Sequence, residues 1–303
     1  MVNIETRMGE ALKQVNLSNT IVDASSGKTI GILDRVTVFN ANEDFKNNQP
    51  FAVMVEGDTT TSRAPIGTAP TLRDNNIRKV TFNRKRISTA IEITKQMLNN
   101  AGFDVETYFK KLAVKRIVQG IEQQMFVTGS ATGSEDDKIQ SIFATPSLWK
   151  YQVATTSAGT GKVTVLKDQM QNALTEYCGN NGKISNDMFW TFNMGILTDV
   201  LDKNGNSVQK DDNLPDGAYA RLLGKSVYHT NYMATQIDTD TTVKPLGILM
   251  SKDSYGVAIS DLELTSVSKT RNGTVVLVVE AWVDGKVLNQ NDALKILVPS
   301  TAF

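Results

Sequence analysis

The chain has 303 residues, of which 40% are hydrophobic, enough to build a sizeable core. Lysine plus arginine and aspartate plus glutamate number 32 each, so the molecule as a whole carries no net charge that would attract nucleic acid or anionic membranes. The single cysteine, Cys178, excludes an internal disulfide and a cysteine zinc cluster, and we expect a buried or half-buried thiol in a reducing compartment.

The first twenty residues predict a short amphipathic helix that docks on another surface. Ile4, Met8, Leu12 and Val15 form its apolar stripe. The segment lacks the apolar core of a signal peptide. No apolar run in the sequence approaches the length of about 18 residues that a membrane-spanning helix needs.

Two strand-like runs follow, over residues 27–39 and 50–58. Residues 58–76, DTTTSRAPIGTAPTLRDNN, then show no apolar period and contain two prolines. Because most connections in compact domains are about 4 to 6 residues long, we interpret this segment as an extended hairpin loop. Such a loop cannot bury itself against its own core, so we expect it to be mobile alone or ordered by another chain.

Residues 78–100 predict a strand that leads into a short helix near Glu92 to Asn100. The densest positive cluster of the chain lies here and comprises Arg78, Lys79, Arg84, Lys85 and Arg86. A solvated strand face or a salt-bridged subunit contact is favoured over a DNA-binding patch, because the basic residues do not alternate with aromatic residues that stack on bases.

A long helix is predicted from Asp104 to Thr128, with Asp104 as N-cap and Gly129 as the stop. At 1.5 Å per residue it would be ~37 Å long. Its apolar residues recur at near-helical spacing, namely Val105, Tyr108, Leu112, Val118, Ile121 and Met125. A second side carries Lys110, Lys111, Lys115 and Arg116.

The remaining sequence alternates helices with strands that are distant in the chain. Residues 165–179 predict a helix with Met170, Leu174, Tyr177 and Cys178 on one side. Residues 187–206 predict a strand, a short helix and a turn at Asn204 and Gly205, and residues 222–233 predict a strand pair. From Leu246 onward most of the chain reads as strand, including a buried strand from Val275. This mixture, without a repeated βαβ unit, indicates the α+β class.

No enzymatic or metal-binding pattern is met. His229 is the only histidine and is interpreted as an ordinary strand residue. The sequence at 159–162, GTGK, lacks the first glycine and the final Ser/Thr of a phosphate loop, and 199–206 lacks the calcium-loop spacing. The acids at 135–137 and 211–212 lie in polar runs, the wrong setting for raised catalytic pKa values. We therefore predict no catalytic residue, no cofactor and no metal, and expect a protein that assembles with copies of itself.

Read in order, the segments resemble a tailed-bacteriophage major capsid protein of the HK97 type. The resemblance runs through VMVEGDTTTSRAPIG, ISTAIEITKQMLNNAGFDVETYFKKLAVKRIVQGIEQQMFVTGSATGS, DMFWTFNMGILTDVLDKNGNSVQ and ARLLGKSVYHTNYM, and closes with KPLGILMSKDSYGVAISDLELTSVS and VVLVVEAWVDGKVLNQNDALKILVP. It extends from about Gly31 to Pro299. No single motif is specific, but their order and spacing together are.

The resemblance implies the HK97-like capsid fold with four parts. These are an N-terminal arm with its lead-in strand (1–48), an extended E-loop (49–85), a peripheral domain (86–145 and 245–290, with the spine helix at 104–128) and an axial domain (146–244 and 291–303). Hexamers and pentamers would then tile an icosahedral head around double-stranded DNA. The head would assemble in the host cytoplasm with a portal, expand from a procapsid and contact the DNA without sequence specificity.

Two departures from the family concern cross-linking and scaffolding. Some members join the E-loop lysine to a neighbour's asparagine, but the nearest match here is Arg63, whose guanidinium stays protonated and is a poor nucleophile. We therefore expect no covalent cross-link, although Lys46 and Lys79 lie nearby in sequence. Because only about thirty residues precede the match, we expect a separate scaffolding protein or a processed chain, and Met1 favours the first.

The candidate residues for contacts between subunits are Glu56, Arg63, Arg78, Lys79, Arg84 and Arg86. Two alternatives remain open at this stage. One is a cellular compartment shell of the encapsulin kind, which encloses enzymes instead of DNA. The other is a soluble hydrolase whose catalytic residues are too scattered for motif detection.

Overall fold

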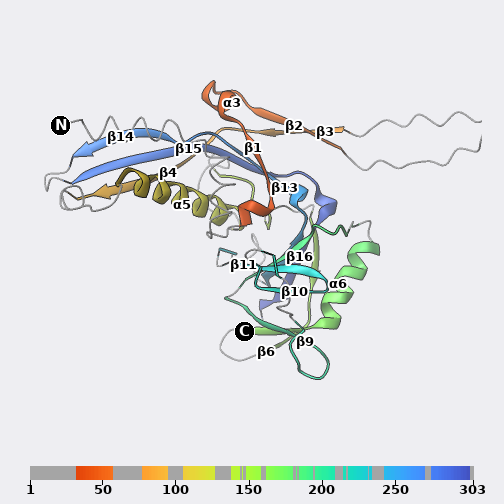
Figure 1. The fold of residues 1–303 in the computed structure, drawn as a ribbon. Coiled ribbons are helices and arrows are strands. Elements are labelled where there is room, and N and C mark those ends of the chain that lie inside the picture. The colour runs from red at the N-terminus through yellow and green to blue at the C-terminus, as the bar shows by residue number, and fades with distance from the viewer. Residues whose placement is uncertain are drawn as a thin grey trace, which may run out of the picture.

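The structure is a computed structural model. It describes residues 32–56, 77–94, 105–126, 138–143, 145, 148–157, 162–179, 182, 184–193, 195–208, 214–215, 218–230, 232–233, 242–269 and 274–300. The predicted N-terminal helix, the loop at 58–76, most of the short helix after Glu92, and the cap and stop of the long helix lie outside these residues. What is described forms an elongated sheet with a helix, a second body below it and a projecting hairpin (Figure 1).

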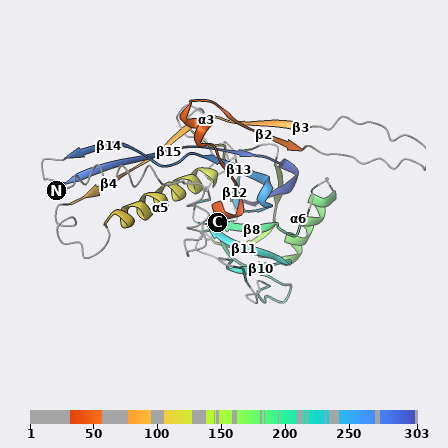
Figure 2. The same cartoon turned by 45° about the horizontal axis from the view of Figure 1, so that its top comes forward.

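The first sheet is built around one long strand, β15 (Val275–Val287). β4 (Lys85–Ile93) pairs antiparallel with one side of it, and β13 (Tyr255–Ile259) and β14 (Glu263–Lys269) pair antiparallel with the other. β1 (Thr37–Asn40) adds in parallel to β13. The helix α5 (Val105–Phe126) covers one face, and the short 3-10 helix η1 (Ile32–Arg35) adjoins its C-terminal part (Figure 2).

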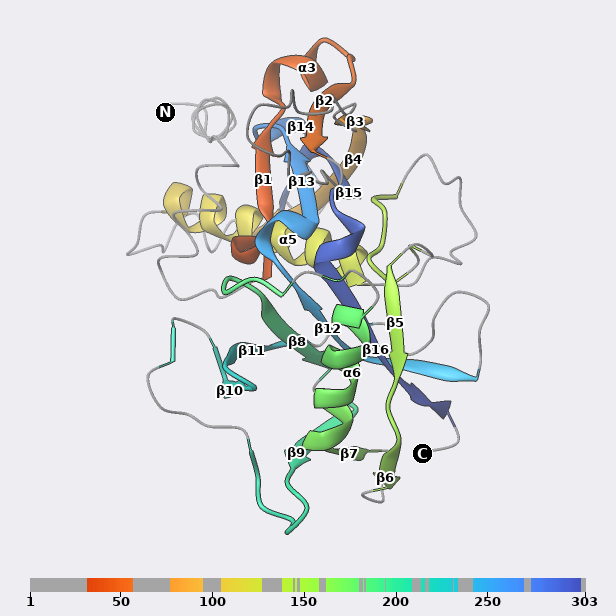
Figure 3. The same ribbon diagram turned by 90° about the vertical axis from the view of Figure 1, so that its right-hand side faces the viewer.

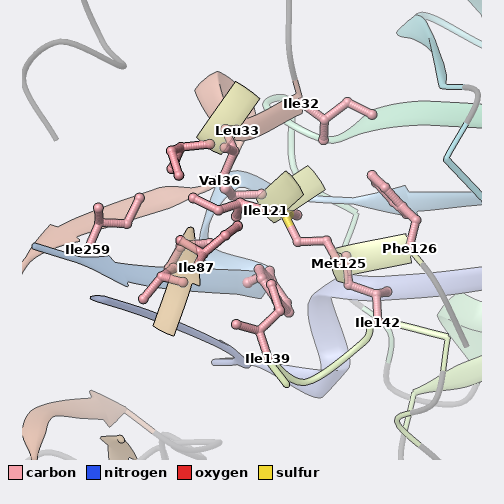
Figure 4. Packing of buried hydrophobic residues seen from close by; sticks show 14 of the residues in the cluster. Ile32, Leu33, Val36, Ile87, Ile121, Met125, Phe126, Ile139, Ile142 and Ile259 are labelled. Atoms are coloured by element: carbon pink, nitrogen blue, oxygen red, sulfur yellow. The ribbon is translucent and has the colours of Figure 1, made fainter. Parts of the chain in front are cut away.

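Alternation along β15 places its buried apolar side chains against α5. Val279, Ala281 and Val283 are buried, as are Ile87 and Ile91 of β4. From the described part of the helix, the buried apolar residues are Ala113, Val114, Ile117, Ile121, Met125 and Phe126. Figure 4 shows Ile121 and Met125 among isoleucines from the sheet and from the segment that follows the helix.

The long helix is confirmed over its described length, and Ile121 and Met125 are buried as predicted. Leu112 and Val118 are only partly buried, because the face turned to the sheet runs through Val114 and Ile117. Lys111, Lys115 and Arg116 are exposed on the other side, as expected.

The second body contains a six-stranded sheet in the order β10, β11, β8, β12, β16, β5. The strands are β5 (Trp149–Gln152), β8 (Phe189–Asn193), β10 (Ala220–Leu222), β11 (Lys225–Thr230), β12 (Val243–Met250) and β16 (Ala293–Pro299). A three-stranded sheet of β6 (Thr155–Ser157), β7 (Val163–Leu166) and β9 (Leu197–Leu201) and the helix α6 (Lys167–Gly179) flank it (Figure 3). A separate apolar cluster forms its core, with Trp190 stacked on Phe192.

A small third unit carries the hairpin. β2 (Phe51–Glu56) and β3 (Ile77–Phe82) pair antiparallel along their whole length, and the short helix α3 (Asn42–Lys46) lies at their base. The β2 strand and this pairing agree with the predicted hairpin, whereas α3 was not predicted. Two further 3-10 turns, η3 (Lys252–Ser254) and η4 (Gln290–Asp292), join strands of the two larger sheets.

Four local expectations are wrong. Residues 32–35 form a 3-10 turn instead of strand, and Glu92 and Ile93 extend β4 instead of starting a helix, because they pair with β15. Residues 197–201 form strand β9 instead of a short helix, because they pair in parallel with β7 and tertiary pairing overrides local propensity. Cys178 is exposed, since the buried stripe of α6 runs through Met170, Ala173 and Tyr177 and ends before it.

Candidate functional site

The two faces of the hairpin differ in what they contact. On the inner face, Phe51 and Phe82 meet Phe39 of β1 in a triangle of tilted rings whose centres lie 5.7–6.0 Å apart. Phe45 of α3 is fully buried beside them. The period of two along a strand puts these residues on one side and their neighbours on the other, so the hairpin rests on the body by one face only.

The outer face presents apolar side chains to solvent. Met54 is 68% exposed and Ile77 is 57% exposed. The register pairs Met54 with Lys79, and alternation along β3 places Ile77 on the same face as both. Exposed large apolar side chains gathered on one projecting face are typical of a surface that another chain covers.

Two arginines of the predicted positive cluster fasten the inner face to the chain's own body. The Arg84 guanidinium lies 3.5 Å from the centre of the Trp282 ring and donates a hydrogen bond of 3.1 Å to the Phe45 carbonyl. Arg78 donates to the Leu288 carbonyl at 2.5 Å. Both side chains therefore hold the base of the hairpin against the end of β15.

The other two cations on the β4 side form ion pairs with acids of β15. Lys85 Nζ lies 3.2 Å from Asp284 Oδ1, and Arg86 pairs with Glu280. Asp284 is completely buried, whereas the Arg86 side chain is half exposed. The sequence cluster thus divides into Lys79, exposed on the outer face, and four residues with partners in the same chain.

Asp284 is the most constrained of these groups. Its carboxylate accepts hydrogen bonds from the backbone N–H of Asn83 at 2.8 Å and of Gly285 at 2.9 Å. Burial raises the pKa of the Asp284 carboxyl, and the Asn83 N–H and Lys85 oppose this rise. Burial, with the charge of Asp284 as a smaller cause, also raises the pKa of the Tyr255 hydroxyl well above its usual value.

A second buried carboxyl, Glu122, joins the long helix to η1. Its Oε1 accepts a hydrogen bond of 3.3 Å from the Leu33 N–H. Burial raises the pKa of Glu122 to about 7, and the nearby charge of Asp34 adds to the shift. The contact therefore titrates near neutral pH.

A buried amine lies in the second body. Lys295 of β16 donates to the carbonyls of Phe143 at 3.2 Å and Thr145 at 2.7 Å. Burial lowers its pKa to about 8, and the Lys150 charge contributes. Lys295 thus fixes the segment through which the chain passes from α5 to the six-stranded sheet.

The polar residues that resemble catalytic or metal-binding groups in the sequence contact other residues of the same chain. His229 is half-buried in β11 with the Tyr219 ring 4.3 Å away, and burial lowers its pKa. Asp202 accepts from the N–H groups of Asn204 and Asn206 and closes the predicted turn. Among the described residues, no group of His, Cys, Asp or Glu could hold a metal ion, and no helix is long and apolar enough to cross a membrane.

The basic residues of this site are predicted from the sequence, but their partners are not. The side chain of Glu56 and all of Arg63 lie outside the described residues. Met54, Ile77, Trp282 and Asp284 were not singled out. The available signal was the presence of the acids Glu280 and Asp284 inside the apolar run VVLVVEAWVDGKV, since an acid in a buried strand needs a partner.

A comparison with known families identifies the family to which this chain belongs. A family model described as the phage capsid family matches residues 14–298. The chain belongs to the phage capsid family. A comparison with curated proteins gave no match.

Solved capsids share the fold of this family member. The capsid of a native GTA particle is 13% identical with a TM-score of 0.58, and the match covers 88% of this chain and 89% of that one. The capsid of cyanophage P-SCSP1u is 14% identical (TM-score 0.51; 88% of each chain). Mycobacterium phage Bobi gives 10% identity and a TM-score of 0.53 (94% of this chain, 99% of that one).

These findings confirm the α+β, HK97-like fold and the function of a major capsid protein. The capsid protein is a structural component of a virion and assembles with copies of itself into a shell.

Proposed function

We propose that the chain forms hexamers and pentamers that tile an icosahedral head around double-stranded DNA. The observation that carries this proposal is the hairpin, whose inner face is fixed to the body while Met54 and Ile77 on its outer face are exposed. A neighbouring subunit that received this face would bury its apolar surface, as closed rings of identical subunits require.

Four parts of the chain carry different roles in this proposal. Residues 1–48 are the arm with its lead-in strand, and 49–85 are the E-loop. Residues 86–145 and 251–290 form the peripheral domain, and 146–250 with 291–303 form the axial domain. One apolar cluster lies under α5 and the first sheet, a second in the second body and a third at the hairpin base, and the first also takes in Phe189, Tyr228 and Ile248 from strands of the second body. Because β12 lies between β8 and β16 in the six-stranded sheet, we place the return to the peripheral domain after Met250 instead of at 245.

The six candidate contact residues divide into those that would contact a neighbouring subunit and those that hold the hairpin to its own subunit. Lys79 is exposed on the outer face beside Met54, which supports it as an ionic contact together with Glu56 and Arg63. Arg86 keeps half of its side chain exposed while it pairs with Glu280. Arg78 and Arg84 hold the hairpin to its own subunit and would act through its position.

Several partners complete the proposal. A separate scaffolding protein would guide assembly in the host cytoplasm and a portal would occupy one vertex. The packaged DNA would contact the interior without sequence specificity, through local groups, because the net charge of zero supplies no general attraction. Expansion from a procapsid would shift the E-loop and spine helix, and the arm and loop, as the parts of lowest stability, would supply the switch.

Electron microscopy of the purified protein and of native particles tests the proposal. We expect five- and six-membered capsomers or closed icosahedral particles, and nuclease-protected double-stranded DNA inside the native ones. A protein that remains a compact monomer under assembly conditions would contradict shell formation. Closed particles filled with protein cargo would instead show a cellular compartment.

A further inference from the structure

The hairpin joins the first sheet through a very short connection. β3 ends at Phe82 and β4 begins at Lys85, so only Asn83 and Arg84 separate them. Whatever fixes these two residues also fixes the direction in which the hairpin leaves the body. Arg84 contacts Phe45, which belongs to the base of the hairpin, and Trp282, which belongs to β15.

Asp284 holds both sides of this connection. One carboxylate oxygen accepts from the Asn83 N–H at 2.8 Å, and the other lies 3.2 Å from Lys85 Nζ. The Gly285 N–H, at 2.9 Å from that second oxygen, fixes the carboxylate to its own strand. A carboxylate that accepts from three donors has one favoured orientation, and that orientation fixes the positions of Asn83 and Lys85.

The same cluster reaches the segment that follows the long helix. Lys85 Nζ also donates to the Lys138 carbonyl, and Tyr255 donates to the Gln140 carbonyl at 2.5 Å. Gln140 in turn donates its N–H to the Gly285 carbonyl at 3.0 Å. This segment continues to β5 of the second body, so the cluster connects three parts of the molecule.

We propose that Asp284 is a positioning residue: its carboxylate, shared by Asn83 and Lys85, sets the direction of the β2–β3 hairpin and couples it to residues 138–140. The inference rests on the proposed function, in which the outer face of the hairpin docks on a neighbouring subunit. Through Lys85 and Tyr255, a change in the path after α5 would be transmitted to the hairpin.

The neighbouring ion pair provides a comparison within the same two strands. Arg86 and Glu280 also join β4 to β15, but both lie inside the paired ladder, where backbone hydrogen bonds already fix the strands, whereas Lys85 is its last paired residue and Asp284 lies one position beyond it. Buried ion pairs contribute little net stability because desolvation offsets their attraction. An ion pair at the connection whose carboxylate is completely buried is therefore better explained by orientation than by stability.

A spin-label distance measurement tests the proposal on the unassembled protein. Native Cys178, exposed on α6, provides one label, and Met54→Cys on the outer face provides the other. Labelled protein is diluted with unlabelled protein so that only distances within one chain are read. We expect Asp284→Asn and Lys85→Met to broaden the distance distribution, and Lys85→Arg to retain the original one.

Glu280→Gln is the matched control and should leave the distribution unchanged. We also expect the Asn83 amide to exchange with solvent about tenfold faster in Asp284→Asn, while amides of β8 and β12 keep their rates. If Asp284→Asn does not fold, Lys85→Met tests the same proposal, because it removes the ion pair and leaves the carboxylate in place.

Two outcomes would overturn the inference. One is a lower unfolding temperature with an unchanged distance distribution, which would show a merely structural role. The other is equal broadening by Glu280→Gln. Failure of the wild-type chain to form particles would contradict the proposed function instead, and the distance measurement would still decide the role of Asp284.

Discussion

Glu122 is a buried carboxyl on the helix face that otherwise buries apolar side chains. Its hydrogen bond to the Leu33 N–H connects the long helix to η1, the first described element of the chain. With a pKa raised to about 7, it binds a proton in the folded protein at pH values where the unfolded chain has already released it. Its contribution to stability is therefore complete below about pH 4.5 and is lost as the pH rises through about 7.

Glu122→Gln should remove this pH dependence. The amide can accept the same hydrogen bond without a buried charge, so at pH 8 we expect the variant to be more stable than wild type, by at most about 3 kcal/mol. At pH 4 the two should be nearly equal. Thermal unfolding of the unassembled protein between pH 4 and 8 measures the difference.

The control for Glu122→Gln is Glu92→Gln, which changes an exposed carboxyl on β4. It should shift the unfolding temperature little at any pH. A wild-type stability that rises between pH 5 and 8 relative to Glu122→Gln would show that the raised pKa is wrong.

At the scale of single elements, the hairpin combines a fixed inner face with a free outer face. Its strands pair along their full length, but the outer side chains of Met54 and Ile77 contribute little to the core of their own subunit. A substitution on the outer face should affect assembly without affecting folding, because folding depends on the inner face of these strands and assembly on the outer face.

Ile77→Asp should leave the unfolding free energy of the isolated protein within about 0.5 kcal/mol of wild type. It should strongly reduce the yield of capsomers and particles, because a charge would be buried without a partner at the contact. Size-exclusion chromatography with electron microscopy measures that yield. Ile184→Asp makes the same change at an exposed site of the second body, and we expect it to assemble.

If Ile77→Asp assembles as well as wild type, the outer face of the hairpin is not a subunit contact. If both variants fail equally, added negative charge alone explains the loss. Lys79 on the same face would then be the next residue to test, because it is exposed beside Met54.

At the scale of the whole particle, the question is whether the shell is held only by non-covalent contacts. By resemblance to cross-linking capsid proteins, we infer that Arg63 is the residue nearest to their E-loop lysine. Because a guanidinium stays protonated, it cannot supply the nucleophilic amine of an isopeptide bond.

We therefore expect mature particles boiled in detergent to release only monomers, visible as a single band on denaturing gels. Particles of Arg63→Lys are the informative comparison, because a lysine restores the nucleophile at this position. A ladder of covalent multimers from wild-type particles would contradict the argument from Arg63, and would point to Lys46 or Lys79.

The order of elements could be predicted from the sequence because hydrophobic period is a local property. The long helix, the β2 strand and the strands after Leu246 all show their period over several residues. Short segments failed, as at 197–201 and at Glu92, because a distant partner strand decides their conformation.

The candidate site shows the same division between local and distant information. The sequence by itself determined the family, the cluster of cations at 78–86 and the absence of a lysine at position 63. It could not show that Arg84 lies over Trp282 or that Lys85 meets Asp284, because these partners are about 200 residues apart in the chain. Only the tertiary structure brings β15 beside the β3–β4 connection, and burial there turns an ordinary aspartate into the group that we propose directs the hairpin.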